Sequence, residues 1–226
     1  MTALQCATTL IIARHGEADY EAPTWAGEGG SLTILGRKQA AALGEQLAGR
    51  RVAHVWTSTL ARAVQTGEIV AARLGIGVTT RIGLREFDVG DQHGVPLEED
   101  PFVATYTRWL EGHLDERVPG GESGQEIADR FDDVLREIAD AHPGETVLVV
   151  SHGGAIGLGV PAIARMDAPR QRLDNCDTVE VLADADGWVC TRYGADPGNR
   201  RRVHPWVPRE GQGRGTGAPS RRGIPT

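Results

Sequence analysis

The segment TTLIIARHGE (8–17) decides the fold, because it joins a largely apolar run directly to charged residues. Its first six residues, 8–13, predict a strand that is buried on both faces, as in a parallel sheet. Arg14, His15 and Glu17 follow at the end of this strand. In open α/β sheets, ligands bind just past the carboxyl ends of the strands. The segment therefore predicts both a central strand and part of a binding site.

The rest of the chain alternates between strand-like and helix-like segments. Further strands are predicted at five places, the last two joined by a turn at 184–187: 52–57, 77–81, 146–151, 178–183 and 188–193. Helices are predicted from Thr33, from Ser58 as N-cap, near 101–113, from a capping box at Ser123 to Pro143, and over 154–165 with an interruption at Pro161. This alternation is typical of a three-layer α/β/α sandwich with a mainly parallel central sheet.

The composition changes at Ala195. We interpret residues 1–194 as one domain, with a small cap-like insertion over about 87–121, and 195–226 as a disordered tail rich in Gly, Pro and Arg. The tail holds seven Arg against two acidic residues and so carries a charge of +5. Because the net charge of the whole chain is −7, residues 1–194 carry −12. A solvated tail without a role of its own is our interpretation, and an arm that binds polyanions or a partner is the alternative.

Composition also narrows the class of protein. No run of about 18 apolar residues occurs, so we expect no membrane span, and residues 1–10 lack the features of a signal peptide. Cys6, Cys176 and Cys190 are few and lack metal-ligand spacing, which indicates reduced thiols and a cytoplasmic protein. The acidic body argues against nucleic acid as the partner. The sequence is compatible with a homodimer.

Two further strand ends carry residues of the same kind as the first. Arg62 lies in the first helical turn after the strand 52–57, and His152-Gly153 follows the strand 146–151. Two His and two Arg thus arrive at one edge of the predicted sheet. Arg binds phosphate oxygens in bidentate fashion and keeps its charge, and neutral imidazole is a competent nucleophile for phosphorus. The cluster therefore predicts a site for a phosphoryl dianion.

Glycines and helix ends fit the same prediction. Arg62 and Gly153 lie near helix N-termini, where free N–H groups attract anions. Gly16 and the pair Gly153-Gly154 would let the backbone approach the phosphate closely. A metal site fits worse, because the cations would oppose a dication and no HExxH motif occurs. We expect no metal and no other cofactor.

A leaving alkoxide needs a proton. Glu86 is the best candidate, because it follows the strand 77–81 and can reach the same edge of the sheet. A nearby phosphate dianion would favour the protonated acid. Asp88 is the competing candidate.

At this point the chain resembles the histidine phosphatase superfamily, the phosphoglycerate-mutase-like clan, over about residues 8–193. Six blocks in order carry the resemblance: LIIARHGE (10–17), LTILGRKQA (32–40), TSTLARAVQT (57–66), LREFDVGDQHG (84–94), PGGES (119–123) and VVSHGGAI (149–156). The resemblance implies a phosphoglycerate-mutase-like fold, a phosphohistidine intermediate and no metal. By the matching motifs, His15 looks like the nucleophile, and Glu86 looks like the proton donor and later the base. Arg14, Arg62 and His152 look like the phosphate clamp.

The chain also departs from the family pattern. Many members carry Asn six residues after the nucleophile, where this chain has Glu21, and the following stretch 22–30 is short. The resemblance therefore does not identify the substrate. We expect the pocket wall to come from 20–31 and 92–120, with Trp25, Tyr106 and Trp109 either lining it or packing in the core.

Three functions remain open to this sequence. A mutase must keep water away from its phosphohistidine and hold a second phosphate, which needs extra cations. The chain between Glu86 and the strand 146–151 supplies Arg108, Arg117 and Arg130 but no basic cluster. We therefore favour a metal-independent phosphomonoesterase acting on a small-molecule phosphomonoester. A cofactor-dependent phosphoglycerate mutase-type phosphotransferase is one alternative. A non-catalytic phosphate-binding module is the other, and the presence of both His15 and Glu86 speaks against it.

Overall fold

A seven-stranded sheet forms the centre of the computed structural model, which describes residues 6–167 and 171–194. The predicted tail 195–226 lies outside the described residues. The strand order is β5-β4-β6-β1-β8-β9-β7. The strands span the following residues: β1 Thr8–Arg14, β4 Val52–Ser58, β5 Val78–Arg81, β6 Thr146–Ser151, β7 Arg165–Met166, β8 Thr178–Asp184 and β9 Gly187–Tyr193.

The strands β5, β4, β6 and β1 are parallel, so their carboxyl ends share one edge of the sheet. β1 pairs with β6 from Thr9 opposite Thr146 to Arg14 opposite Ser151. On its other side, β1 pairs with β8 in antiparallel fashion, and β8 continues through a tight turn into β9. The prediction of a mainly parallel sheet is confirmed.

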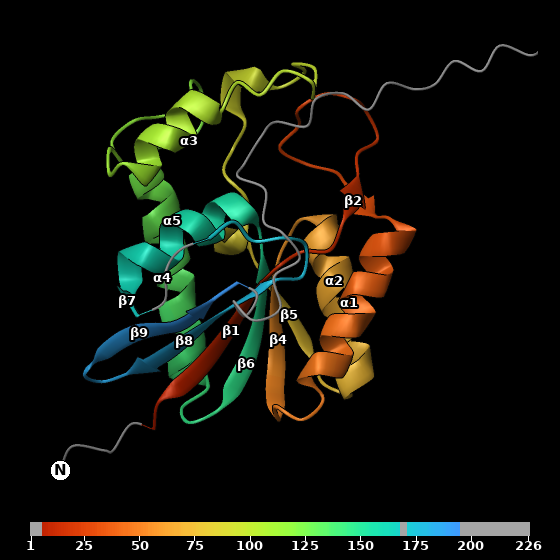
Figure 1. Cartoon of the computed structure of the whole chain (residues 1–226), viewed down its shortest axis with the longest axis vertical. Helices are drawn as coiled ribbons and strands as arrows, with labels where there is room; N and C mark the ends of the chain where they lie inside the picture. Colours follow the sequence, from red (N-terminus) through yellow and green to blue (C-terminus); the bar gives the residue numbers. More distant parts are fainter. Residues whose placement is uncertain (1–5, 168–170, 195–226) are drawn as a thin grey trace, which may run out of the picture.

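Helices cover both faces of the sheet (Figure 1), which confirms the three-layer prediction. One face carries α1 (Ile34–Leu47) and α2 (Ala61–Leu74), and the other carries α4 (Gly124–Ala141) and α5 (Gly153–Ile163). The middle of β1, residues 10–13, is apolar at every position because it contributes to two cores. Ile11 and Ala13 pack with the α1–α2 layer, whereas Leu10 and Ile12 pack with the α4–α5 layer, all of them fully buried.

Helix ends match the sequence in two places and differ in two. Thr33 caps α1 through a bond from Gly36 N–H, and Ser123 forms the complete predicted capping box with Glu126 at the start of α4. The prediction of Ser58 as N-cap is wrong, since the N-cap of α2 is Leu60 and makes no side-chain cap bond. The predicted interruption at Pro161 is also wrong, because α5 continues to Ile163.

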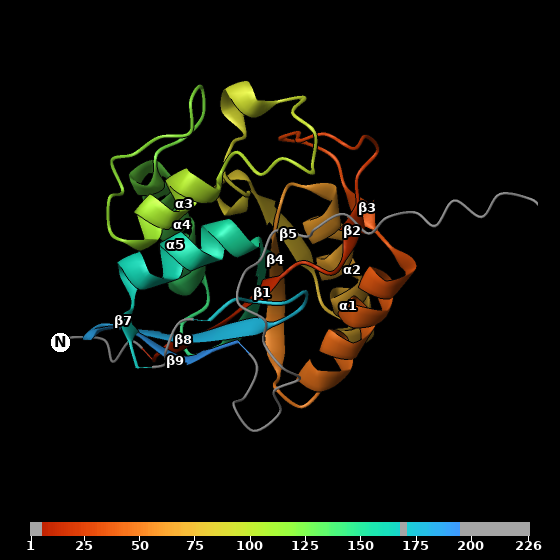
Figure 2. The same ribbon diagram turned by 45° about the horizontal axis from the view of Figure 1, so that its top comes forward.

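The segment after β5 is mostly irregular and lies above the carboxyl edge of the sheet. It contains two short 3-10 turns, η1 (Ile82–Leu84) and η2 (Gly90–Gln92), and the helix α3 (Val103–Leu110), shorter than the predicted 101–113. It pairs with the loop between β2 (Ala18–Asp19) and β3 (Ser31–Leu32). Trp25 N–H donates to Val95 O at 2.8 Å, and Leu97 N–H donates to Pro23 O at 3.0 Å. Figure 2 shows these two segments side by side.

Among the described residues, no helix combines the length and the apolar character needed to cross a membrane. The three cysteines carry free thiols. Burial raises the pKa of Cys176 to about 12 and that of Cys190 to about 11, so both remain protonated near neutral pH.

Candidate active site

A pocket of about 930 Å³ opens at the carboxyl edge of the sheet. Arg14 and His15 from the end of β1, Arg62 from the first turn of α2, and Gly153 from the start of α5 all contribute to its wall. Glu86, which follows η1, also lines it. The rings of His152 and His15 lie 5.1 Å apart. The structure thus brings together the five side chains that the sequence placed at strand ends.

His15 is held as a neutral imidazole. Its Nδ1 lies 2.7 Å from Gly16 O, and because a carbonyl only accepts, Nδ1 carries the hydrogen and Nε2 keeps its lone pair. The backbone is fixed as well, since His15 N–H donates to Ser151 O and the Asn175 side chain donates to His15 O. Burial, reinforced by the charge of the two arginines, lowers the pKa of His15 to about 3.

Both arginines line the pocket, and each uses part of its guanidinium on a backbone carbonyl. Arg14 donates one bond to Leu173 O and Arg62 donates one to Gly29 O, each at 2.8 Å. Arg14 Nε, Arg62 Nε and His152 Nδ1 are buried without a hydrogen-bond partner among the described residues. Burying a polar nitrogen without a partner costs about 1–3 kcal/mol, more for a charged group. Three such atoms around one imidazole are therefore typical of a preformed site for an oxygen-rich anion.

His152 is fully buried between β6 and α5. Its Nε2 lies 2.8 Å from Ser58 Oγ, which also accepts a bond from Leu60 N–H at 3.2 Å. Burial, followed by the proximity of His15, lowers the pKa of His152 well below its ordinary value. The role of Ser58 is thus to hold this ring rather than to cap α2.

Glu86 lies at the N-terminus of α5. Its carboxylate accepts bonds from Gly154 N–H at 3.0 Å, Ala155 N–H at 2.8 Å and Phe87 N–H at 3.2 Å. A Cβ on Gly154 would lie 2.6 Å from the Glu86 carboxylate and 2.8 Å from the Phe87 ring. Glycine at 154 therefore makes room for this acid, which is a different reason from the backbone approach expected from the sequence.

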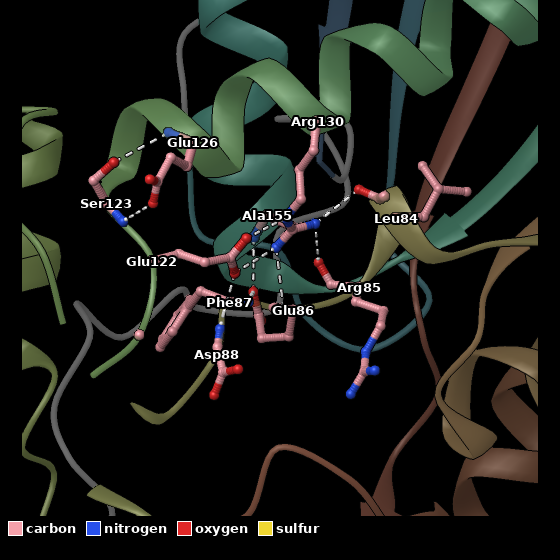
Figure 3. A network of polar contacts seen from close by, with 12 residues as sticks. Leu84, Arg85, Glu86, Phe87, Asp88, Glu122, Ser123, Glu126, Arg130 and Ala155 are labelled. Carbon is pink, nitrogen blue, oxygen red and sulfur yellow. Dashed lines mark hydrogen bonds and ion pairs between the residues drawn. The ribbon is translucent and has the colours of Figure 1, made fainter. Parts of the chain in front are cut away.

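Arg130 of α4 braces the backbone that carries Glu86 (Figure 3). Its guanidinium donates to three carbonyl oxygens of that segment: Gly83 at 2.7 Å, Arg85 at 2.8 Å and Glu86 at 3.2 Å. Glu122 completes the brace, since it accepts from Arg130 Nε at 2.6 Å and from Asp88 N–H at 3.0 Å. The sequence does not predict this role: Arg130 counted there only as a possible cation for a second phosphate, and a charged pair on a helix flank gives no signal that it braces a distant backbone segment.

Gly16 does not lie at the phosphate site, where the sequence predicted it. It is not part of the pocket wall, and its N–H donates to Thr66 Oγ1 at 3.0 Å. A Cβ there would meet Gly36 O of α1 at 2.7 Å, so packing explains the glycine. Thr66 in turn donates to Arg62 O at 2.7 Å and links the two phosphate-facing segments. Its spacing of four residues from Arg62 on one helix was the available signal.

The remaining residues considered from the sequence differ in whether they line the pocket. Asp88 is exposed, lies outside the pocket wall and accepts from Gly90 N–H. Glu21 accepts from Gly30 N–H at 3.1 Å, a bond that lowers its pKa. Trp25 and Tyr106 line the pocket as expected, whereas Trp109 is buried in the core. Within the described ranges, no three His, Cys, Asp or Glu side chains form a group that could hold a metal ion.

The buried imidazoles predict a pH-dependent stability. When folding lowers the pKa of a histidine, the unfolded chain takes up the proton at a higher pH than the folded chain does. The free energy of unfolding therefore keeps its full value above about pH 6.5 and decreases as the pH falls toward the pKa of the folded state. Replacing His15 with glutamine removes one such group. The difference in unfolding free energy between pH 7.5 and pH 5 should then shrink by about 2 kcal/mol in urea titrations. The exposed His113→Gln serves as control and should keep the wild-type difference.

Comparisons with known proteins agree with this geometry. Residues 10–196 match the model of the histidine phosphatase superfamily (branch 1). The chain is 36% identical over 202 residues to the probable phosphoglycerate mutase GpmB of Citrobacter koseri, covering 82% of this chain and 92% of that protein. Among solved structures, a mycobacterial glucosyl-3-phosphoglycerate phosphatase in complex with VO3 is 26% identical, with a TM-score of 0.68 and coverage of 83% and 99%. YhfR of Bacillus stearothermophilus is 27% identical, with a TM-score of 0.67 and coverage of 82% and 96%. This chain belongs to the histidine phosphatase superfamily.

Proposed function

We propose that the protein is a metal-independent phosphomonoesterase that hydrolyses a small phosphomonoester through a phosphohistidine on His15. The single observation that carries the proposal is the neutral His15 surrounded by buried, unpartnered nitrogens of Arg14, Arg62 and His152. Phosphoryl transfer is mostly positioning and charge neutralisation, which this set supplies without a metal ion. The mycobacterial relative was solved in complex with VO3, a phosphate-like oxyanion, which supports a phosphoryl ligand for this chain.

In the first step, the lone pair of His15 Nε2 attacks phosphorus and the bond from phosphorus to the leaving oxygen breaks. Glu86, in its protonated form, donates a proton to that oxygen, so the alcohol leaves neutral. Arg14 and Arg62 neutralise the phosphoryl oxygens. In the tautomer that the proposal requires, Ser58 O–H donates to His152 Nε2, 2.8 Å away, and the hydrogen on His152 Nδ1 is donated to a phosphoryl oxygen.

In the second step, water attacks the phosphohistidine. The Glu86 carboxylate accepts a proton from the attacking water while the bond between phosphorus and Nε2 breaks. His15 regains its lone pair, Glu86 regains its proton, and inorganic phosphate leaves. The sum of both steps is one ester and one water converted to one alcohol and one phosphate.

The pocket favours a phosphatase over a mutase. A mutase must bind a second anionic group beside the transferred phosphate. Beyond the clamp, Arg172 is the one cation among the described residues that line the pocket, and Glu86 and Asp100 are acidic. The name of the Citrobacter relative favours the mutase, whereas the mycobacterial relative is a phosphatase.

The proposal is tested with p-nitrophenyl phosphate in the presence and absence of a chelator. Turnover that the chelator leaves intact supports a metal-independent phosphatase. Loss of turnover with the chelator would indicate a metal enzyme. Activity confined to phosphoglycerate with a bisphosphoglycerate primer would indicate a mutase, and phosphate binding without turnover would indicate a binding module.

The proposal also predicts an effect of Arg130, which does not line the pocket. Arg130→Met removes three hydrogen bonds to carbonyl oxygens of the Glu86 segment and two to Glu122, and should lower kcat by up to about a hundredfold, because misplacing a group by ~1 Å can cost that much. KM should change little, since the clamp is untouched. Arg136→Met on the same helix, where Arg136 pairs with Asp132 at the surface, is the matched control. An equal rise in KM would point to general damage instead.

A further inference from the structure

The pocket extends well beyond the phosphate clamp. We use the name apolar annex for the part that is walled by aromatic and aliphatic side chains: Trp25, Phe87, Leu97, Phe102, Tyr106 and Leu110. A total volume of about 930 Å³ lies at the upper end of the range for pockets that enclose drug-sized ligands. One phosphoryl group fills only a small part of it.

The aromatic wall is packed in one arrangement. The Phe87 ring lies 5.3 Å from that of Phe102 and 6.5 Å from that of Tyr106, and Trp25 packs edge-on against Phe102 at 5.0 Å. Trp25 is fixed further by a bond from its indole N–H to Glu99 O at 2.7 Å. Because the rings hold one another, a ligand there loses little energy to rearrangement of the wall.

Glycines of α5 let this wall approach the catalytic edge. A Cβ on Gly157 would lie 2.5 Å from the Tyr106 hydroxyl, and one on Gly154 would lie 2.8 Å from the Phe87 ring. Both glycines line the same pocket as His15 and Glu86. The annex is therefore continuous with the phosphate site.

The direction of the leaving group follows from the position of the acid. Under the proposed function, Glu86 protonates the leaving oxygen, so the body of the alcohol must leave the clamp on the side of Glu86. Phe87 is the next residue along the chain and is part of the annex wall. We propose that the substrate is the phosphomonoester of an alcohol or phenol with an aliphatic or aromatic body that fills the annex.

The charged residues of the pocket wall also favour a leaving group without a charge of its own. Arg172 is exposed, and Asp100 places a carboxylate on the wall, where it accepts a bond from Phe102 N–H. Beyond the clamp, a leaving group with its own carboxylate or second phosphate would therefore meet one exposed cation, one carboxylate and mainly apolar walls. This substrate class rests on the proposed function and narrows it to esters with uncharged, apolar bodies.

The test is a series of straight-chain alkyl phosphates from ethyl to octyl. The alcohols differ little in acidity, so the chemical step stays constant and kcat/KM measures burial of the chain. Full burial of a methylene should raise kcat/KM about fourfold, and partial burial about twofold. The substrate class would be overturned if kcat/KM did not rise with chain length, or if kcat/KM for 3-phosphoglycerate exceeded the values for the alkyl phosphates.

Leu110→Asp tests the annex itself. Leu110 is 46% exposed, so the variant should fold, and a carboxylate there should reduce the gain per methylene toward unity. Ile34→Asp is the control, since Ile34 is 78% exposed on α1, outside the pocket wall, and should keep the wild-type gain. An unchanged gain in Leu110→Asp would overturn the proposal.

The outcomes separate the two proposals. Hydrolysis of p-nitrophenyl phosphate with a flat alkyl series would overturn the substrate class and leave the phosphatase intact. Absence of turnover with every ester would overturn both.

Discussion

Replacing His15 with alanine is expected to abolish turnover, with a loss of about 10⁵-fold or more in kcat. The reason is that Nε2 of this ring is the proposed attacking atom, and Nδ1 is already committed to Gly16 O. Among the described residues, His15 is the one imidazole that lines this pocket, and no thiol lines it. The variant should still bind inorganic phosphate, because both guanidiniums remain.

Rapid-quench labelling makes this prediction specific to a covalent route. Wild-type enzyme mixed with labelled ester and quenched early should carry protein-bound phosphate that survives alkali and is lost in acid. The His15→Ala variant should carry none. His113→Ala, a surface histidine, serves as control and should keep both the label and the turnover. Turnover within about tenfold of wild type in His15→Ala would rule out His15 as the nucleophile.

The sequence predicted the central part of the fold because its strongest signals are local. The runs at 8–13 and 146–151 are apolar on both faces, which is typical of strands covered by two helical layers, and the structure has them side by side as β1 and β6. Once those strands are parallel, the residues that follow them must meet at one edge. Arg14, His15 and His152 could therefore be placed together without coordinates.

The sequence could not predict contacts made across long separations by ordinary residues. Arg130 reaches carbonyl oxygens more than forty positions away, and Ser58 bonds His152 from 94 positions away. Backbone carbonyls are the same in every residue, so no motif marks them as partners. Ser58 shows the consequence, since its position before a helix predicted a cap while the structure uses its hydroxyl on the buried ring.

The histidines and arginines of the site are held in the same way by these contacts. Backbone or side-chain bonds hold each pocket-facing group at one end and leave the other end free: Nδ1 of His15 and Nε2 of His152 are bonded, whereas Nδ1 of His152 and Nε of both arginines are not. Groups that are oriented before the ligand arrives need no reorganisation when charge develops. Glu86 is held more fully, since both of its carboxylate oxygens accept backbone bonds, Oε1 from Phe87 and Ala155 and Oε2 from Gly154.

Glu86→Gln should slow the chemical step by about 10²–10⁴-fold, the range that a positioned acid and base contributes. An amide of nearly the same shape cannot donate an acidic proton to the leaving oxygen or take one from water. Phosphate binding should remain close to that of wild type, because glutamine leaves Arg14, Arg62 and His152 untouched. Asp88→Asn tests the rival acid and should be nearly neutral, since Asp88 lies outside the pocket wall.

The leaving group decides whether Glu86 acts as an acid or only shapes the pocket. A nitrophenolate leaves without help, whereas an alkoxide needs its proton during bond breaking, so the loss in Glu86→Gln should be much larger for alkyl phosphates than for p-nitrophenyl phosphate. The comparison uses kcat/KM, which reports the first step for both esters. A purely structural role would lower both values by the same factor, because a distorted clamp does not distinguish one leaving group from another.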